Sequence, residues 1–163
     1  MRTFARAVLL FLLLILTGCV TSPIPPGYTG PTARLLDYGE METGFRAIFF
    51  YVSEVNGKPI KTSLNAAREI NYGRGFSMTP QSITRLVPPG KMTLKLEGRH
   101  AYGAPIQELV MAATMRSVTE TYEVDLKPDV LYQVRGVLAD GKDEIWLEVF
   151  DTGERIGRKV PGK

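Results

Sequence analysis

The stretch KMTLKLEGR, residues 91–99, alternates strictly between apolar and polar side chains. Met92, Leu94 and Leu96 fall on one side of an extended chain, while the lysine, threonine and glutamate side chains fall on the other. Because successive side chains of a β-strand point to opposite faces, this pattern predicts a strand with one buried face and one solvated face.

The chain around this strand repeats the pattern between turn signals. Pro88-Pro89-Gly90 precedes it, and Gly90 suits the left-handed position of a type II turn. SVTETYEVDL (117–126) and VLYQVRGVL (130–138) alternate in the same way, and Asp140-Gly141 predicts a hairpin into DEIWLEVF (143–150). Turns that recur about every ten residues, with period-two patterning between them, predict an antiparallel sandwich or barrel.

Two further segments predict a central strand and a last strand. GFRAIFFYVSEV (44–55) carries apolar residues on both faces, which predicts a central strand, and Asn56-Gly57 predicts a tight turn after it. Pro59 then makes the returning strand short or places it at an edge. After a turn at 151–153, ERIGRKV (154–160) predicts one modest last strand.

Two segments favour helix over strand. SLNAAREI (63–70) has the length of two helical turns. In residues 105–115, Pro105 suits a first helical position, and Ile106, Leu109 and Val110 share a helical face. Either segment is also compatible with irregular loop. We therefore expect a mainly β domain with at most one or two short helices.

The amino-terminal residues have the layout of an export signal. Arg2 and Arg6 give a positive start, AVLLFLLLIL (7–16) is an unbroken apolar run, and small residues follow it. The run is shorter than the ~20 residues that a membrane-spanning helix needs. We interpret residues 1–18 as a cleaved signal peptide.

The four residues Leu16-Thr17-Gly18-Cys19 resemble the bacterial lipoprotein box. The resemblance implies that fatty acyl chains such as palmitate are attached to Cys19 and that the chain is cut just before it. Val20 is not the aspartate that retains such proteins in the inner membrane, so the resemblance implies lipid anchoring in the outer membrane, facing the periplasm. The alternatives are an ordinary secreted protein with an unmodified cysteine and a catalytic thiol, which would need a neighbouring base.

Composition divides the mature chain into two parts. Residues 19–33 are rich in proline, glycine, serine and threonine and predict a tether behind the lipidated cysteine, while residues 34–163 are enough for a single domain. Two of the 20 Lys and Arg residues lie in the leader, which leaves 18 against 17 acidic residues. This balance does not support nucleic-acid binding, which needs a basic face.

The carboxyl-terminal half resembles known β-modules. LVPPGKMTLKLEG, YEVDLKP, LYQVRG and IWLEVFDTGERIG look like the body of small uncharacterised envelope lipoproteins, and like prealbumin-like or PEGA-type modules in which a Pro-Gly turn feeds an alternating strand. We therefore expect an immunoglobulin-like or prealbumin-like β-sandwich. These motifs are structural, and the resemblance carries over no catalytic residue.

No familiar enzyme constellation is present in the sequence. It has no nucleophile elbow, no phosphate-binding loop and no second histidine beside His100, which we interpret as a surface or turn residue. We expect a protein that is not an enzyme and has no catalytic residue, no cofactor and no metal. Trp146 alternates away from Ile145 and Leu147, which is compatible with a position facing the second sheet or an interface, and packing in the core is the default expectation for it.

We expect the protein to act through its surface. The candidate residues are aromatic or basic: Arg74, Phe76, Arg99, His100, Tyr102, Arg155, Arg158 and Lys159. The leading hypothesis is a non-catalytic, lipid-anchored interaction or structural module of the cell envelope with an envelope protein as partner. The alternative is a module that binds envelope glycan or a small ligand through the loops 72–76 and 99–102.

Overall fold

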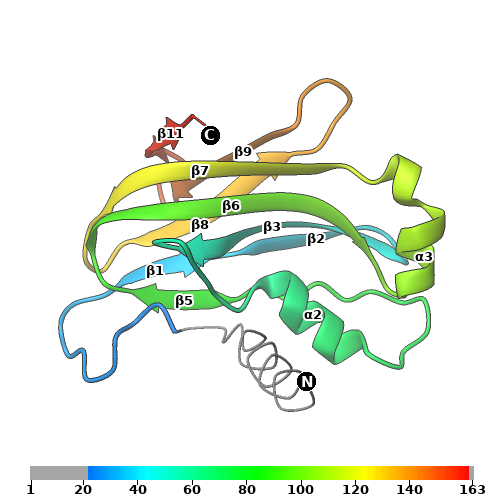
Figure 1. The fold of residues 1–163 in the computed structure, drawn as a ribbon, viewed down its shortest axis with the longest axis horizontal. Coiled ribbons are helices and arrows are strands. Elements are labelled where there is room, and N and C mark those ends of the chain that lie inside the picture. The colour runs from blue at the N-terminus through cyan, green and yellow to red at the C-terminus, as the bar shows by residue number, and fades with distance from the viewer. Residues whose placement is uncertain (1–21, 162–163) are drawn as a thin grey trace, which may run out of the picture.

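The alternating segments form strands in two sheets that pack face to face (Figure 1). One helix lies against the outer face of the second sheet, and a shorter helix lies at one end of it. The computed structural model describes residues 22–161. The first sheet has the order β10 (Arg155–Ile156), β9 (Glu144–Val149), β8 (Leu131–Val137), β1 (Ala33–Leu36) and β5 (Thr84–Val87). The second has the order β11 (Arg158–Val160), β7 (Ser117–Leu126), β6 (Gly90–Tyr102), β3 (Arg46–Val55) and β2 (Tyr38–Thr43), with β4 (Lys58–Pro59) beside β3.

The prediction of a mainly β, antiparallel sandwich is confirmed. The strand pairs are antiparallel apart from β1 and β8, which run parallel. The expected helices are also present, as α2 (Ser63–Asn71) and α3 (Pro105–Val110), and a single 3₁₀ turn, Ala112–Thr114, follows α3. Thr62 caps α2, because its hydroxyl oxygen accepts a hydrogen bond from the Asn65 N–H at 3.1 Å.

The predicted alternation matches the observed burial. Met92, Leu94 and Leu96 of β6 are buried and pack between the sheets with residues of the facing sheet such as Val134 and Leu147. This arrangement removes the apolar face of each sheet from water, which is the main stabilising contribution to a sandwich.

Strand β3 is central, as predicted, and both of its faces are buried. Phe50 and Val52 face the core between the sheets. Phe49 and Tyr51 belong to a second cluster, on the outer face of the sheet, where Leu64 of α2 covers them. The doubly apolar pattern of this strand therefore reflects a helix on one side and a sheet on the other.

The carboxyl-terminal segment departs from the prediction of one last strand. It forms two short strands, β10 in the first sheet and β11 in the second, and Gly157 lies between them with φ of 89°. A glycine tolerates this positive φ, so the chain can cross from one sheet to the other at that residue. The Pro88–Gly90 turn likewise links β5 of one sheet to β6 of the other.

The default expectation for Trp146 is wrong. Its neighbours Ile145 and Leu147 are buried, so Trp146 points to the outer face of its sheet, where the Arg155 guanidinium lies 3.7 Å from the centre of a tryptophan ring. The Trp146 Nε1–H donates to a Glu148 carboxylate oxygen at 2.6 Å. Ordinary strand alternation therefore decides the position of this side chain.

Candidate interaction surface

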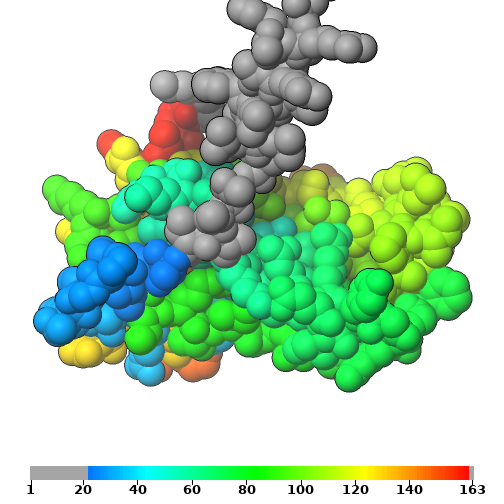
Figure 2. Space-filling model, turned by 60° about the horizontal axis from the view of Figure 1, so that its bottom comes forward, coloured from blue at the N-terminus to red at the C-terminus, as the bar shows by residue number. Residues whose placement is uncertain are grey.

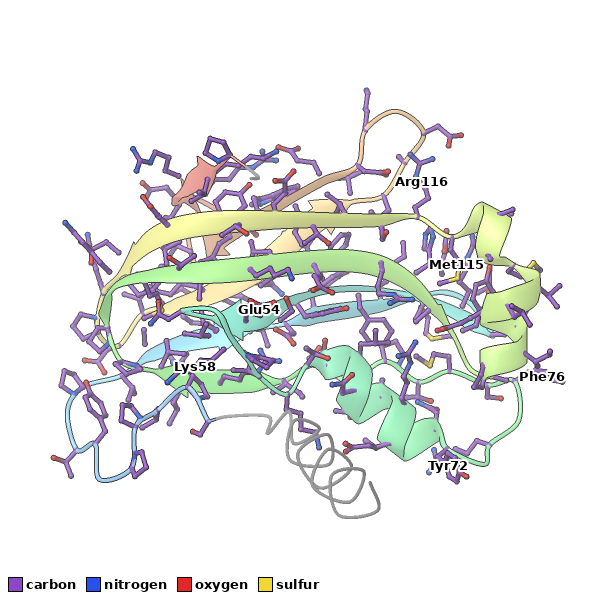
Figure 3. All side chains as sticks on the ribbon, viewed as in Figure 1. Glu54, Lys58, Tyr72, Phe76, Met115 and Arg116 are labelled. Carbon is purple, nitrogen blue, oxygen red and sulfur yellow. The ribbon has the colours of Figure 1, made fainter. Side chains whose placement is uncertain are left out.

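Exposed apolar side chains gather at one end of the sandwich, around α3 and the loop that follows α2. Val110 and Leu109 of α3 are each 73% exposed, and Tyr72, which directly follows α2, is 91% exposed. We call this set the apolar patch, and its members are Tyr72, Phe76, Ile106, Leu109, Val110 and Met111. Figure 3 shows Phe76 projecting outward beside α3 and Tyr72 at the end of α2. The shared face of Ile106, Leu109 and Val110 is thus turned to solvent and not to a core.

The loop that carries Phe76 is held by specific contacts. The Asn71 side-chain amide donates to the carbonyl oxygens of Ala67 and Thr79 at 2.7 and 3.0 Å, and its oxygen accepts from the Thr79 N–H at 3.1 Å. Asn71 therefore closes the loop that spans residues 72–78. The loop backbone also runs against Gly103, where a Cβ would collide with the carbonyl oxygens of Phe76 and Ser77. Only glycine permits this close approach.

Two hollows open into the apolar patch and share Tyr102. The larger has a volume of about 620 Å³, and the smaller one, of about 260 Å³, lies between Phe76 and α3. At the rim of the larger hollow, Arg68 of α2 donates through Nη2 to both carboxylate oxygens of Glu108 of α3, at 2.8 and 2.9 Å. The pair links the two helices and leaves mostly apolar walls inside the hollows.

The structure brings together only some of the predicted surface residues. Phe76 and Tyr102 line the same hollow, and Tyr102 stacks against Phe45 with ring centroids 6.3 Å apart. Arg74 lies in the exposed loop between Tyr72 and Phe76, and its side chain makes no ion pair with any residue in the range 22–161. These residues form a coherent surface with the apolar patch.

Arg99 and His100 lie beside this surface without forming part of it. Arg99 is half-buried and its Nε–H donates to the His100 carbonyl oxygen at 3.4 Å. His100 is only 4% exposed, so the interpretation of a surface or turn histidine is wrong. Its Nδ1 accepts a hydrogen bond from the Arg116 N–H at 3.2 Å, and its Nε2 lies 3.5 Å from a carboxylate oxygen of Glu42.

The surroundings of His100 decide its protonation. Burial lowers the pKa of the imidazole, and the nearby guanidinium groups of Arg46 and Arg116 act in the same direction, while the carboxylates of Glu42 and Asp143 oppose them. The neutral ring is therefore the favoured form, with Nδ1 as an acceptor for a backbone N–H.

The three basic residues near the carboxyl terminus lie elsewhere. Each has a glutamate partner: Arg155 with Glu144 at 2.7 Å, Arg158 with Glu123 at 2.6 Å and Lys159 with Glu120 at 2.5 Å. Strand β11 pairs with β7 opposite the first half of β6, whereas the apolar patch surrounds the end of β6. Their charge is therefore compensated locally and does not extend the apolar patch.

Sequence reasoning missed the most deeply buried charged pair. Asp37, with no exposed surface, accepts hydrogen bonds from both terminal nitrogens of Arg85, which is 8% exposed. The same carboxylate accepts from the backbone N–H groups of Val52 and Ser63 at 3.2 and 2.9 Å. Because Ser63 begins α2, Asp37 ties the helix to both sheets. An aspartate and an arginine 48 positions apart carry no local signal of this contact.

Several expectations concern the lipid anchor, metal binding and membrane-spanning helices. Cys19 and the signal peptide lie outside the described residues. Within residues 22–161, no group of three or more His, Cys, Asp or Glu side chains is placed to hold a metal ion. In the same range, every helix is too short or too polar to span a membrane.

Comparison of the chain with protein-family models, with curated proteins and with solved structures found no match.

Proposed function

We propose that this protein is a non-catalytic lipoprotein of the bacterial envelope, anchored in the outer membrane through Cys19 and facing the periplasm, which acts as an interaction module. The observation that carries the proposal is the apolar patch. Side chains such as Leu109 and Val110 expose most of their surface, although burying an aliphatic side chain is favourable by about 1.5–3 kcal/mol. Contiguous exposed apolar surface of this kind marks binding sites in soluble domains.

The geometry of the apolar patch supports protein binding in a second way. The surrounding loop is closed by Asn71 and supported at Gly103, and α3 is linked to α2 by the Arg68–Glu108 pair. A surface held in this manner is preorganised, so that binding costs little conformational entropy.

The test is site-specific photo-crosslinking in intact cells. A photoreactive residue in place of Leu109 is expected to yield one dominant protein adduct, whereas the same residue in place of Phe150, which is 48% exposed, yields none. Leu109→Asp is expected to abolish capture of the same partner from detergent-solubilised envelopes, and Phe150→Asp to leave it intact. Equal adducts at both positions would overturn the proposal.

The lipid anchor is tested separately. Mass spectrometry of the mature protein is expected to find acyl chains on Cys19, and Cys19→Ala is expected to release the protein into the periplasmic fraction. An unmodified Cys19 in the mature protein would refute the lipid anchor without affecting the proposed role of the apolar patch.

A ligand-binding module is the second candidate, and the hollow of about 620 Å³ is the observation that favours it. The polar groups at its edge are already engaged: Asn71 holds the loop and Arg68 holds Glu108. A glycan, which offers many hydroxyl groups, would find few free partners there, so the hollow suits an apolar ligand better. A thermal shift with medium-chain fatty acids but not with envelope oligosaccharides would support this second function.

A further inference from the structure

The first described residues do not behave as a free spacer. Residues 22–26 line a groove of about 600 Å³ together with the β3–β4 hairpin and the Pro88–Pro89 link. Within this segment Pro23 and Ile24 are half-buried, and the Tyr28 N–H donates to the Pro25 carbonyl oxygen at 3.2 Å. The segment therefore contacts the domain through Pro23 and Ile24, whereas most residues between Ile24 and β1 are exposed.

This groove and the apolar patch lie at opposite ends of the longest strand. The groove includes Met92, near the start of β6, and both hollows of the apolar patch include Tyr102, the last residue of β6. Ten residues of strand separate them, which at ~3.3 Å per residue is about 33 Å. Figure 2 shows the same separation, with the first described residues in blue at one end and α3 in yellow-green at the other.

The lipid anchor would enter the membrane at the groove end. Cys19 precedes Ser22 by three residues, and three residues of extended chain reach at most about 11 Å. Lys58 and Lys91, both exposed, line the groove and make no ion pair with any other described residue. Two free ammonium groups at this end suit the phosphate groups of lipid headgroups.

We propose that the segment 22–26 is a fixed strut that stands the domain upright on the membrane, with Lys58 and Lys91 at the headgroups and the apolar patch directed away from it. This inference rests on the proposed acylation of Cys19. Interfacial apolar side chains penetrate a bilayer by ~5–10 Å, so a surface about 33 Å away cannot reach the lipid. The apolar patch therefore faces away from the lipid, and a protein segment is its occupant under the proposed function.

The chemistry of that protein segment follows from the apolar patch and its rim. The two hollows accept apolar side chains, and Tyr72 and Phe76 add aromatic surface around them. Arg74 lies between these two aromatic residues as an exposed cation without an ion-pair partner among the described residues. The partner segment thus carries apolar side chains with an acidic residue beside them.

The test measures which end of the lipidated protein lies at the membrane. Because Cys19 is the only cysteine of the chain and is acylated in the proposed mature protein, Asn56→Cys, in the groove, and Val110→Cys each provide one labelling site, and both leave Lys58 and Lys91 in place. The two variants are labelled with a fluorophore and reconstituted into vesicles whose headgroups carry a nitroxide quencher. We expect the label at position 56 to lose most of its fluorescence and the label at position 110 to lose almost none.

Each other outcome overturns the inference. Stronger quenching at position 110 would mean that the apolar patch inserts into lipid, and equal quenching at both positions would mean that the segment is a free spacer. A second variant, with Pro23, Pro25 and Pro26 replaced by glycine, is expected to remove the difference between the two positions while the fold is retained. Failure of acylation is distinguishable, because the protein would then not float with vesicles at all.

Discussion

The buried Asp37–Arg85 pair predicts an unusually large loss of stability from one isosteric substitution. Asp37→Asn keeps the shape of the side chain but leaves the Arg85 guanidinium, which is only 8% exposed, without its counter-charge. Removing one partner of a buried ion pair costs about 3–5 kcal/mol, against the ~5–15 kcal/mol that stabilises a typical domain. The variant is therefore expected to lose about a fifth or more of the free energy of unfolding.

The measurement is urea unfolding followed by circular dichroism. With a slope of about 2 kcal/mol per molar urea, a loss of about 4 kcal/mol lowers the unfolding midpoint by about 2 M. The matched control is Glu123→Gln, which removes the counter-charge of the exposed Arg158 and is expected to cost no more than ~1 kcal/mol.

The double variant Asp37→Asn with Arg85→Met separates charge from packing. It removes the unpaired guanidinium, while the amide introduced at position 37 can still accept a backbone hydrogen bond, so most of the lost stability is expected to return. If Asp37→Asn lowers the unfolding midpoint no further than Glu123→Gln does, the claim that burial makes the Asp37–Arg85 pair costly to break is refuted.

Three further predictions concern other parts of the molecule. Folding lowers the pKa of His100 below its ordinary 6.5, so the unfolded chain binds more protons than the folded protein as the pH falls through that value. The stability of the wild type is therefore expected to fall there more steeply than the stability of His100→Gln. Urea midpoints of the two proteins that run parallel between about pH 7 and 5 would contradict this. Asn71→Ala removes the three hydrogen bonds that close the loop, and trypsin is expected to cut after Arg74 faster than in the wild type; an unchanged cleavage rate would argue against the clamp. Gly157→Val places a Cβ only 2.7 Å from the Val124 Cγ1, at φ of 89°, and is expected to cost about 1–3 kcal/mol in urea unfolding; a neutral effect would contradict the described crossover.

Local pattern was sufficient for most of the strands. Strict alternation in β6 and β7 reports which side chains face the core, since the period of a strand is fixed by its backbone. The turn dipeptide Asn56-Gly57 was equally informative, because both residues adopt positive φ after β3, as a tight hairpin requires. These features depend on neighbours in the sequence and can be predicted without knowledge of the rest of the chain.

The assignment of strands to sheets depends on distant contacts. Strand β1 pairs with β5 on one side and runs parallel to β8 on the other, nearly 100 residues later in the sequence, and no local pattern encodes that choice. The burial of His100 has the same origin, since its cover comes from Glu42 and from the segment at Arg116. A histidine in an alternating strand gives no sign of these neighbours.

The candidate surface was found only in part, for a related reason. The aromatic loop around Phe76 was visible in the sequence, whereas the pattern of α3 showed only that its apolar residues share a helical face. A helix of six residues makes fewer than two turns, so pattern alone cannot decide whether its apolar residues meet a core or the solvent. Strand β6 ends at Tyr102, and the chain then leads into α3. This position at the end of β6 decides that the apolar residues of α3 meet the solvent.

Helix α2 connects the two unusual features of this molecule. The Asp37 carboxylate accepts a hydrogen bond from Ser63 at the first turn of α2, and Asn71 at its last residue holds the loop of the apolar patch. The helix is therefore fixed at both ends by polar contacts that are independent of its apolar face. If the apolar patch must be rigid to bind, Asp37→Asn should weaken partner capture only in proportion to the fraction of unfolded protein. Asn71→Ala should weaken partner capture even in a fully folded protein, because only this change loosens the binding surface itself.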